Sequence, residues 1–140
     1  MRMFAFIVTF IMAYCNISAQ TEKETVFVNF DIDSNEKCTI DVEGKGYLQV
    51  KKYRKTMLQD KVRYLICDQK FDLMDKSCVV MDSTKIKTLH LSELDYLLKK
   101  KHEGILRQNP FNAIFLIEKI HENKFAKHKV YWTDEWSEVD

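Results

Sequence analysis

The sequence predicts an α+β fold: a mainly antiparallel sheet of about five to seven strands, with one amphipathic helix at about residues 92–108 inserted before a C-terminal β-hairpin. Between residues 26 and 81, several short stretches alternate apolar and polar residues, as half-buried strands do. A stripe of leucines at helical spacing follows. The chain then carries a dense apolar run at 111–120, a polar break and an alternating run at 125–136, which is typical of a hairpin.

The N-terminal segment resembles a secretory signal peptide. Arg2 precedes an apolar stretch at residues 3–14, and Ala19 offers a small residue for cleavage. The apolar stretch is shorter than the roughly 18 to 20 residues that span a membrane. We therefore expect residues 1–19 to be removed, and residues 20–140 to form a single α+β domain that is periplasmic or secreted and has no membrane span. A retained anchor helix or a buried core helix is the alternative.

The charge of the mature chain is balanced. The full chain has 22 basic and 21 acidic residues, and removal of Arg2 leaves 22 − 1 = 21 basic residues. Binding to nucleic acid or to a membrane surface depends on a sustained positive excess, so the sequence argues against both. The expected partner is an unknown envelope macromolecule or an anionic ligand, and no cofactor is expected.

The strands are predicted from alternation and from turn signals. They cover residues 26–32, 38–42, 47–53 and 61–67, with a short strand possible at 78–81. Gly44 and Gly46 mark the turn before the third strand, in which Leu48 and Val50 are expected to face inward. Residues 69–88 otherwise show no clear pattern.

The helix is predicted from a capping signal and an apolar stripe. Ser92 is a candidate N-cap with an acid, Asp95, three residues later. Asn109 and Pro110 end the helix. The stripe consists of Leu94, Leu97, Leu98 and Ile105.

The C-terminal hairpin is predicted with Ile120 opposite Phe125 and Glu118 opposite Lys127, which would place opposite charges across from each other. Both faces are apolar, so the hairpin is expected inside the sheet. One face would carry Ala113, Phe115, Ile117, Val130 and Trp132, and the other Ile114, Leu116, Ile120, Phe125 and Tyr131.

The mature chain keeps three cysteines, an odd number for an exported protein. The simplest expectation is a disulfide between Cys67 and Cys78, with Cys38 buried and free. Three reduced cysteines are the alternative, because spacing does not determine connectivity.

Sequence motifs for catalysis are largely absent. There is no Gly-x-Ser-x-Gly, no glycine-rich phosphate loop and no Cys-x-x-Cys. No metal site is predicted, since the calcium-loop-like start at Asp31 has Glu36 where that loop needs glycine. The sequence therefore favours a protein without enzymatic activity. A hydrolase that uses His128 or His90 with a carboxylate is the enzymatic alternative, and His128 is expected to face inward.

Two basic clusters with aromatic neighbours are candidate binding surfaces. One consists of Lys51, Lys52, Tyr53 and Arg54, and the other of Lys127, Lys129 and Tyr131. Together with the export signal, they favour a small exported non-enzymatic module that binds a macromolecule or an anionic ligand at the cell envelope. A third possibility is an inhibitor or immunity-type protective protein, which would have no catalytic site of its own.

Overall fold

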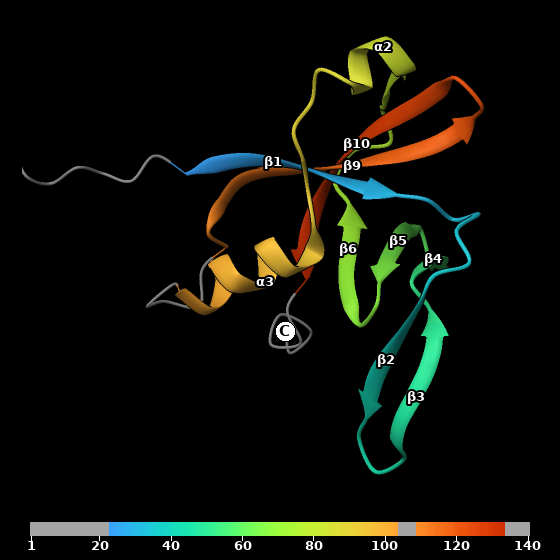
Figure 1. The fold of residues 1–140 in the computed structure, drawn as a ribbon, viewed down its shortest axis with the longest axis vertical. Coiled ribbons are helices and arrows are strands. Elements are labelled where there is room, and N and C mark those ends of the chain that lie inside the picture. The colour runs from blue at the N-terminus through green and yellow to red at the C-terminus, as the bar shows by residue number, and fades with distance from the viewer. Residues whose placement is uncertain (1–22, 104–108, 134–140) are drawn as a thin grey trace, which may run out of the picture.

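The computed structural model describes residues 23–103 and 109–133 (Figure 1). The predicted signal peptide, Ile105 and Trp136 lie outside these residues. The described chain is richer in β-structure than predicted, and its large sheet has eight strands. The sheet is also mixed, because the first strand pairs in parallel with two neighbours.

The strands and helices follow one another as β1 (Glu24–Phe30), β2 (Lys37–Val42), β3 (Gly46–Lys51), β4 (Tyr53–Leu58), β5 (Lys61–Ile66), β6 (Gln69–Leu73), β7 (Val79–Asp82), α2 (Ser83–Ile86), β8 (Leu91–Ser92), α3 (Leu94–Glu103), β9 (Phe111–His121) and β10 (Lys124–Thr133). The large sheet has the order β4-β5-β6-β10-β9-β1-β8, and β7 pairs with β10 beside β6. β2 and β3 form a separate two-stranded sheet. The predicted hairpin therefore lies in the interior of the sheet, as expected.

The register of the β9–β10 hairpin differs from the prediction by one residue. It begins as predicted, with Lys124 opposite His121, but an irregularity between Lys124 and Phe125 shifts the remaining pairs. A shift of one residue moves every side chain to the other face. Glu118 therefore lies opposite Ala126 instead of Lys127, and the predicted Glu118–Lys127 pair is wrong.

The shift also changes which residues form the core. Ile114, Leu116, Val130 and Trp132 are buried in one cluster with Val26, Val28 and Phe30 of β1. Phe115 was expected in the same face as Val130 and Trp132. It lies instead on the opposite face of the sheet, half-buried and stacked on Phe27.

The large sheet is rolled, so that strands distant in its order come together on the core side. Phe30 of β1 packs against Tyr53 of β4 and Tyr64 of β5, with ring centroids 5.5 and 5.0 Å apart. Lys55 of β4 reaches Glu118 of β9. We call this meeting of β1 and β9 with β4 and β5 the seam of the sheet.

Helix α3 contributes to the same core. Leu97 is completely buried, and Leu94 and Leu98 pack against the core cluster, so this part of the predicted stripe is confirmed. The helix begins at Leu94, and Ser92 belongs to the short strand β8. Ser92 is therefore not the N-cap, because the first helical amides bond to the carbonyl of Glu93.

The strand predicted at residues 47–53 is divided at Lys52 into β3 and β4. β2 and β3 project from the body as an arm (Figure 1). Leu48 is 54% exposed on this arm, so the prediction that it faces the core is wrong.

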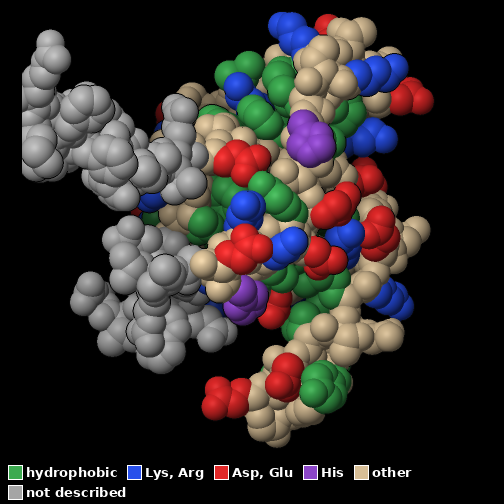
Figure 2. Space-filling view, turned by 60° about the vertical axis from the view of Figure 1, so that its left-hand side comes forward, with side chains coloured by type: hydrophobic (Ala, Val, Ile, Leu, Met, Phe, Trp, Pro, Cys, Tyr) green, Lys and Arg blue, Asp and Glu red, His purple; other side chains and the backbone are tan. Residues whose placement is uncertain are grey.

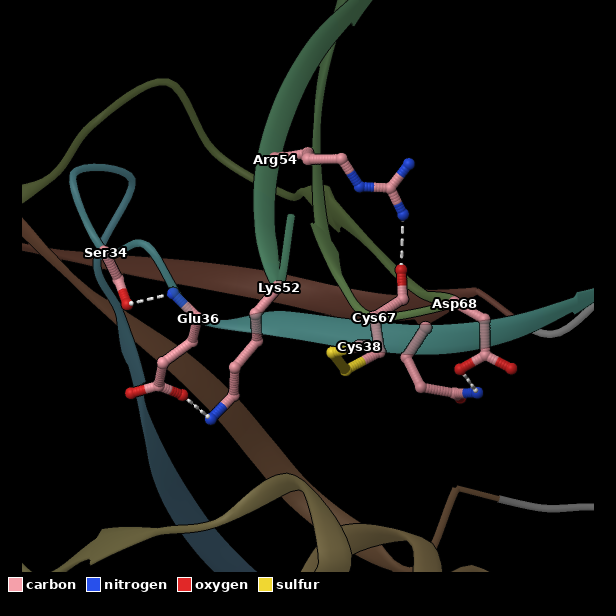
Figure 3. Close-up of a disulfide and its surroundings, with 8 residues drawn as sticks. Ser34, Glu36, Cys38, Lys52, Arg54, Cys67 and Asp68 are labelled. Carbon is pink, nitrogen blue, oxygen red and sulfur yellow. Dashed lines mark hydrogen bonds and ion pairs between the residues drawn. A yellow bond between two sulfur atoms is a disulfide. The ribbon is translucent and has the colours of Figure 1, made fainter. Parts of the chain in front are cut away.

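A disulfide joins the base of this arm to the turn after β5. It links Cys38 to Cys67, with a Cα–Cα distance of 5.5 Å (Figure 3). Cys78 is a free, exposed thiol, so the predicted Cys67–Cys78 bridge and the buried, free Cys38 are wrong. The topology explains why these two cysteines pair. The backbone hydrogen bond from Cys67 to Lys52 holds the start of β4, and with it the arm, against the β5–β6 turn.

We expect Cys78 to be the only cysteine of the described chain that reacts with a thiol reagent before reduction. Cys78→Ser should abolish labelling of the mature protein under denaturing conditions. Reduction of the Cys38–Cys67 bridge should lower the free energy of unfolding by about 2–4 kcal/mol, because it releases a long loop in the unfolded chain. Labelling of three cysteines without reduction would contradict the bridge, and mass spectrometry would identify the modified positions.

Candidate functional site

The first predicted cluster, at residues 51–54, is engaged in internal contacts. Tyr53 is only 6% exposed and belongs to the core. Lys52 lies 2.6 Å from Glu36, and this hydrogen bond raises the pKa of Lys52 (Figure 3). Lys51 donates to the backbone carbonyl of Ile32, and Arg54 donates to that of Cys67. These basic side chains stabilise the arm and the β5–β6 turn through internal contacts, and they do not form one open surface.

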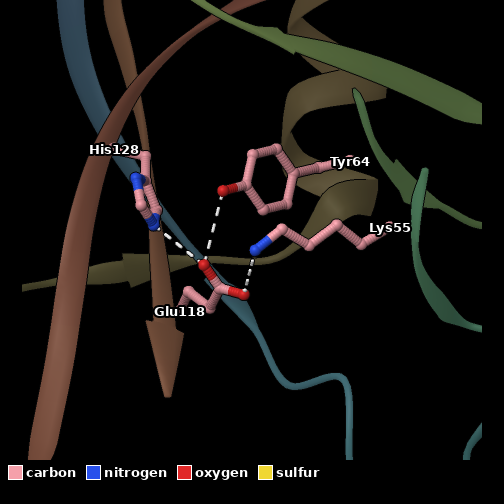
Figure 4. A network of polar contacts seen from close by, with 4 residues as sticks. All are labelled: Lys55, Tyr64, Glu118 and His128. Atoms are coloured by element: carbon pink, nitrogen blue, oxygen red, sulfur yellow. Dashed lines mark hydrogen bonds and ion pairs between the residues drawn. The ribbon is translucent and has the colours of Figure 1, made fainter. Parts of the chain in front are cut away.

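His128 lies in a polar cluster at the seam, as Figure 4 shows. Its Nε2 atom is 2.8 Å from Oε2 of Glu118, a residue that is only 7% exposed. Tyr64 donates its hydroxyl to the same oxygen at 3.3 Å, and Lys55 donates to Oε1 at 2.9 Å. The inward orientation predicted for His128 is confirmed, and its carboxylate partner is Glu118.

The electrostatics of this cluster favour an ionised Glu118. Burial alone would raise the pKa of its carboxyl group, but hydrogen bonds from His128 and Lys55 outweigh burial and hold the pKa at about 2. Burial, followed by the adjacent Glu118 carboxylate, raises the pKa of Tyr64. The carboxylate thus anchors three donors from three strands across the seam.

This cluster resembles part of a hydrolytic site, since a carboxylate orients a histidine. A nucleophile is not in place, however: no serine, threonine or cysteine among the described residues hydrogen-bonds to His128. Glu118 itself is a weak base at neutral pH because its pKa is so low. His90 is exposed and has no carboxylate partner within 23–103 or 109–133. The geometry therefore supports a structural role for the cluster.

The second predicted cluster lies on the face of the sheet opposite the core, which we call the outer face. Lys127, Lys129 and Tyr131 share this face, as alternation predicted, and Tyr131 is 51% exposed. Lys129 lies opposite Phe115, and the Lys127 ammonium is 5.0 Å from the centre of the Phe115 ring. Phe27 stacks on Phe115, with ring centroids 5.6 Å apart. Basic and aromatic side chains therefore form one surface.

The charge of the outer face is strongly asymmetric. Strand pairing also places Arg54, Lys61, Arg63, Lys70 and Lys119 on it. Asp72 is the acidic side chain that the described strands place there, and Arg63 holds it through hydrogen bonds of 2.6 and 3.0 Å. The hydrogen bond from Arg63 lowers the pKa of Asp72, which stays ionised and neutralises that arginine in part. Lys127 and Lys129 have no acidic partner in the described part of the chain.

The face drawn in Figure 2 shows no such separation of charge. Acidic and basic side chains are intermingled on it. The net charge near zero that the sequence shows is therefore an average, which conceals a basic outer face. Sequence reasoning missed Phe27 and Phe115 as parts of this surface, because the parallel pairing of β1 with β9 leaves no local signal.

Within residues 23–103 and 109–133, no group of three or more histidine, cysteine, aspartate or glutamate side chains is arranged to hold a metal ion. None of the described helices has the length and apolar character needed to cross a membrane.

No protein-family model matches the chain, and no curated protein or solved structure is significantly similar to it.

Proposed function

We propose that this protein is a small exported, non-enzymatic binding module, and that it holds an anionic macromolecule of the cell envelope on its outer face. The observation that carries this proposal is the pair Lys127 and Lys129, which have no acidic partner among the described residues and lie beside Phe115 and the exposed Tyr131. Export is part of the proposal and rests on the signal-like N-terminal sequence.

The surface has the properties that such binding requires. Lysines without acidic partners attract an anionic partner over about a Debye length and speed its association. Aromatic side chains add contact area at a low cost in side-chain entropy, and Tyr131 also offers a hydroxyl group. The rigid sheet beneath fixes these groups before the partner arrives, which lowers the entropy cost of binding.

Two alternatives remain as candidate functions. An inhibitor or immunity-type protein would use the same outer face, with an acidic enzyme as its partner. A hydrolase would rely on His128 and Glu118, which do lie together. The binding function is better supported, because the Glu118 carboxylate already accepts three hydrogen bonds and no described residue offers a nucleophile to His128.

Charge reversal of both lysines should test the proposal. We expect Lys127→Glu combined with Lys129→Glu to weaken capture of the partner from an envelope extract by about tenfold or more, since exposed charge pairs contribute up to about 1 kcal/mol each and reversal adds repulsion. Captured species would be identified by mass spectrometry, and wild-type capture should weaken as salt is raised.

A matched double variant on the arm, Lys37→Glu with Lys45→Glu, makes the same change in net charge on exposed residues away from the outer face. This control should retain capture. Equal loss in both double variants would show that net charge alone governs binding, and would refute a site on the outer face.

A further inference from the structure

The arm formed by β2 and β3 presents an open strand edge. β2 pairs with β3 and with no other described strand. The amide group of Lys52 donates to the carbonyl group of Glu36, so the even-numbered residues of β2 are the ones that bond to β3. The backbone groups of Lys37, Thr39 and Asp41 therefore point away from β3, along the free edge. Such an edge is a template for pairing with a further strand.

One face of the arm is apolar. Side chains alternate along a strand, so the even-numbered residues share a face, which carries Cys38, Ile40 and Val42 of β2 with Leu48 and Val50 of β3. The disulfide ties this face to the body at the base of the arm, whereas Leu48, nearer the tip, is 54% exposed. A sheet of two strands is marginally stable at best. Further strands on the open edge would extend the apolar face and bury part of it.

The opposite face of β2 carries charges in a self-complementary order. Lys37 is at the base of the arm, Asp41 lies toward its tip, and Glu43 is the first residue of the turn. All three are exposed, and none has an ion-pair partner among the described residues. An antiparallel pairing of two copies of β2, centred on Ile40, would place Lys37 of each copy opposite Glu43 of the other. Thr39 would then lie opposite Asp41, which can accept a hydrogen bond from its hydroxyl group.

The neighbouring registers are less favourable. Registers that use the same backbone groups differ by steps of two residues. A step toward the tip would place Asp41 opposite Asp41, and like charges directly opposite each other are destabilising. A step toward the base would place the apolar Val42 opposite the exposed Glu36. Of these three registers, the one centred on Ile40 pairs apolar residues with apolar residues and places opposite charges together.

We propose that β2 is a dimerisation strand, which pairs antiparallel with β2 of a second copy of this chain about a two-fold axis at Ile40. Apolar contacts on one face and two Lys37–Glu43 ion pairs on the other then hold a four-stranded sheet together. A strand of six residues is about 20 Å long, so the antiparallel arms keep the two bodies apart at opposite ends. The interface does not include the outer face, and each copy keeps a complete outer face whether or not it dimerises.

Sedimentation equilibrium of the mature protein should test this interface. We expect wild type to show a reversible monomer–dimer equilibrium between about 1 µM and about 1 mM. Lys37→Glu and Glu43→Lys should each weaken dimerisation by about tenfold, because each dimer then contains two like-charged contacts in place of two ion pairs. Lys76→Glu is the matched control for Lys37→Glu. It makes the same change in net charge at an exposed position between β6 and β7, and it should leave the equilibrium unchanged.

An equimolar mixture of Lys37→Glu and Glu43→Lys separates paired strands from a general effect of charge. In a dimer of one copy of each variant, both contacts between positions 37 and 43 again join opposite charges. The mixture should therefore dimerise about as tightly as wild type, and native mass spectrometry should identify the mixed dimer by its mass. A wild type that stays monomeric up to about 1 mM would overturn the proposal. A mixture that dimerises no better than either variant alone would also overturn it.

Discussion

Phe30→Ala should lower the free energy of unfolding by about 3–5 kcal/mol, a large share of the roughly 5–15 kcal/mol that stabilises a domain of this size. Phe30 is completely buried at the end of β1. Its ring makes T-shaped contacts with the rings of Tyr53 and Tyr64, which come from two other strands. Truncation would leave a cavity where the rolled sheet closes, and neighbours fixed in separate strands cannot fill it.

Phe115→Ala is the matched control for this experiment, because it removes the same number of atoms from a half-buried position on the outer face. This change should lower the free energy of unfolding by about 1 kcal/mol, since Phe115 withdraws less apolar area from water than Phe30 does. Urea melts of the two variants should separate their midpoints clearly. If both variants melt alike, the sheet does not close around Phe30 as described.

Local alternation predicted the faces of individual strands well. Val26, Val28 and Phe30 are buried together, and so are Tyr64 and Ile66, as their spacing indicated. Alternation failed at β9–β10, where the irregularity at Lys124 exchanged the two faces. Both faces of that hairpin are apolar, so the pattern contained no signal that could have fixed the register.

Features that depend on contacts distant in sequence could not be predicted. β6 and α2 lie in the stretch 69–88, where β6 is stabilised by pairing with β5 and β10 rather than by a strong pattern of its own. The Cys38–Cys67 bridge likewise requires the arm to lie beside the β5–β6 turn. The division of residues 47–53 at Lys52 creates that arm, and the alternation runs through it without a break.

The candidate surface was predicted in part. Lys127, Lys129 and Tyr131 share a face because alternate residues of any strand do. Their aromatic neighbours come from β9 and β1, which only the register of the folded sheet brings together. The cluster at residues 51–54 looked similar in sequence, but Glu36 and two backbone carbonyls engage its cations.

Glu118→Gln should lower the free energy of unfolding by about 3 kcal/mol at neutral pH. The variant keeps the size of the side chain but leaves Lys55 and His128 without the carboxylate that they share. Breaking a buried charged contact by removal of one partner costs about 3–5 kcal/mol, and the lower end applies because Lys55 is 35% exposed. The difference between the ordinary pKa of 4.5 and the pKa of about 2 corresponds to a similar energy.

The sign of the pH dependence follows from this lowered pKa. Glu118 binds a proton less readily in the folded state than in the unfolded state. Its contribution to the free energy of unfolding is therefore complete above about pH 5 and is lost as the pH falls toward 2. The free energies of unfolding of wild type and Glu118→Gln should therefore differ most near neutral pH and converge in acid. Urea melts at a series of pH values would measure this. Glu36→Gln is the control, since Glu36 is 61% exposed and its pair with Lys52 should contribute less than about 1 kcal/mol. A constant difference between the free energies of unfolding of wild type and Glu118→Gln down to pH 2 would mean that the carboxylate is not ionised within the seam, and that the charge of Lys55 is balanced elsewhere.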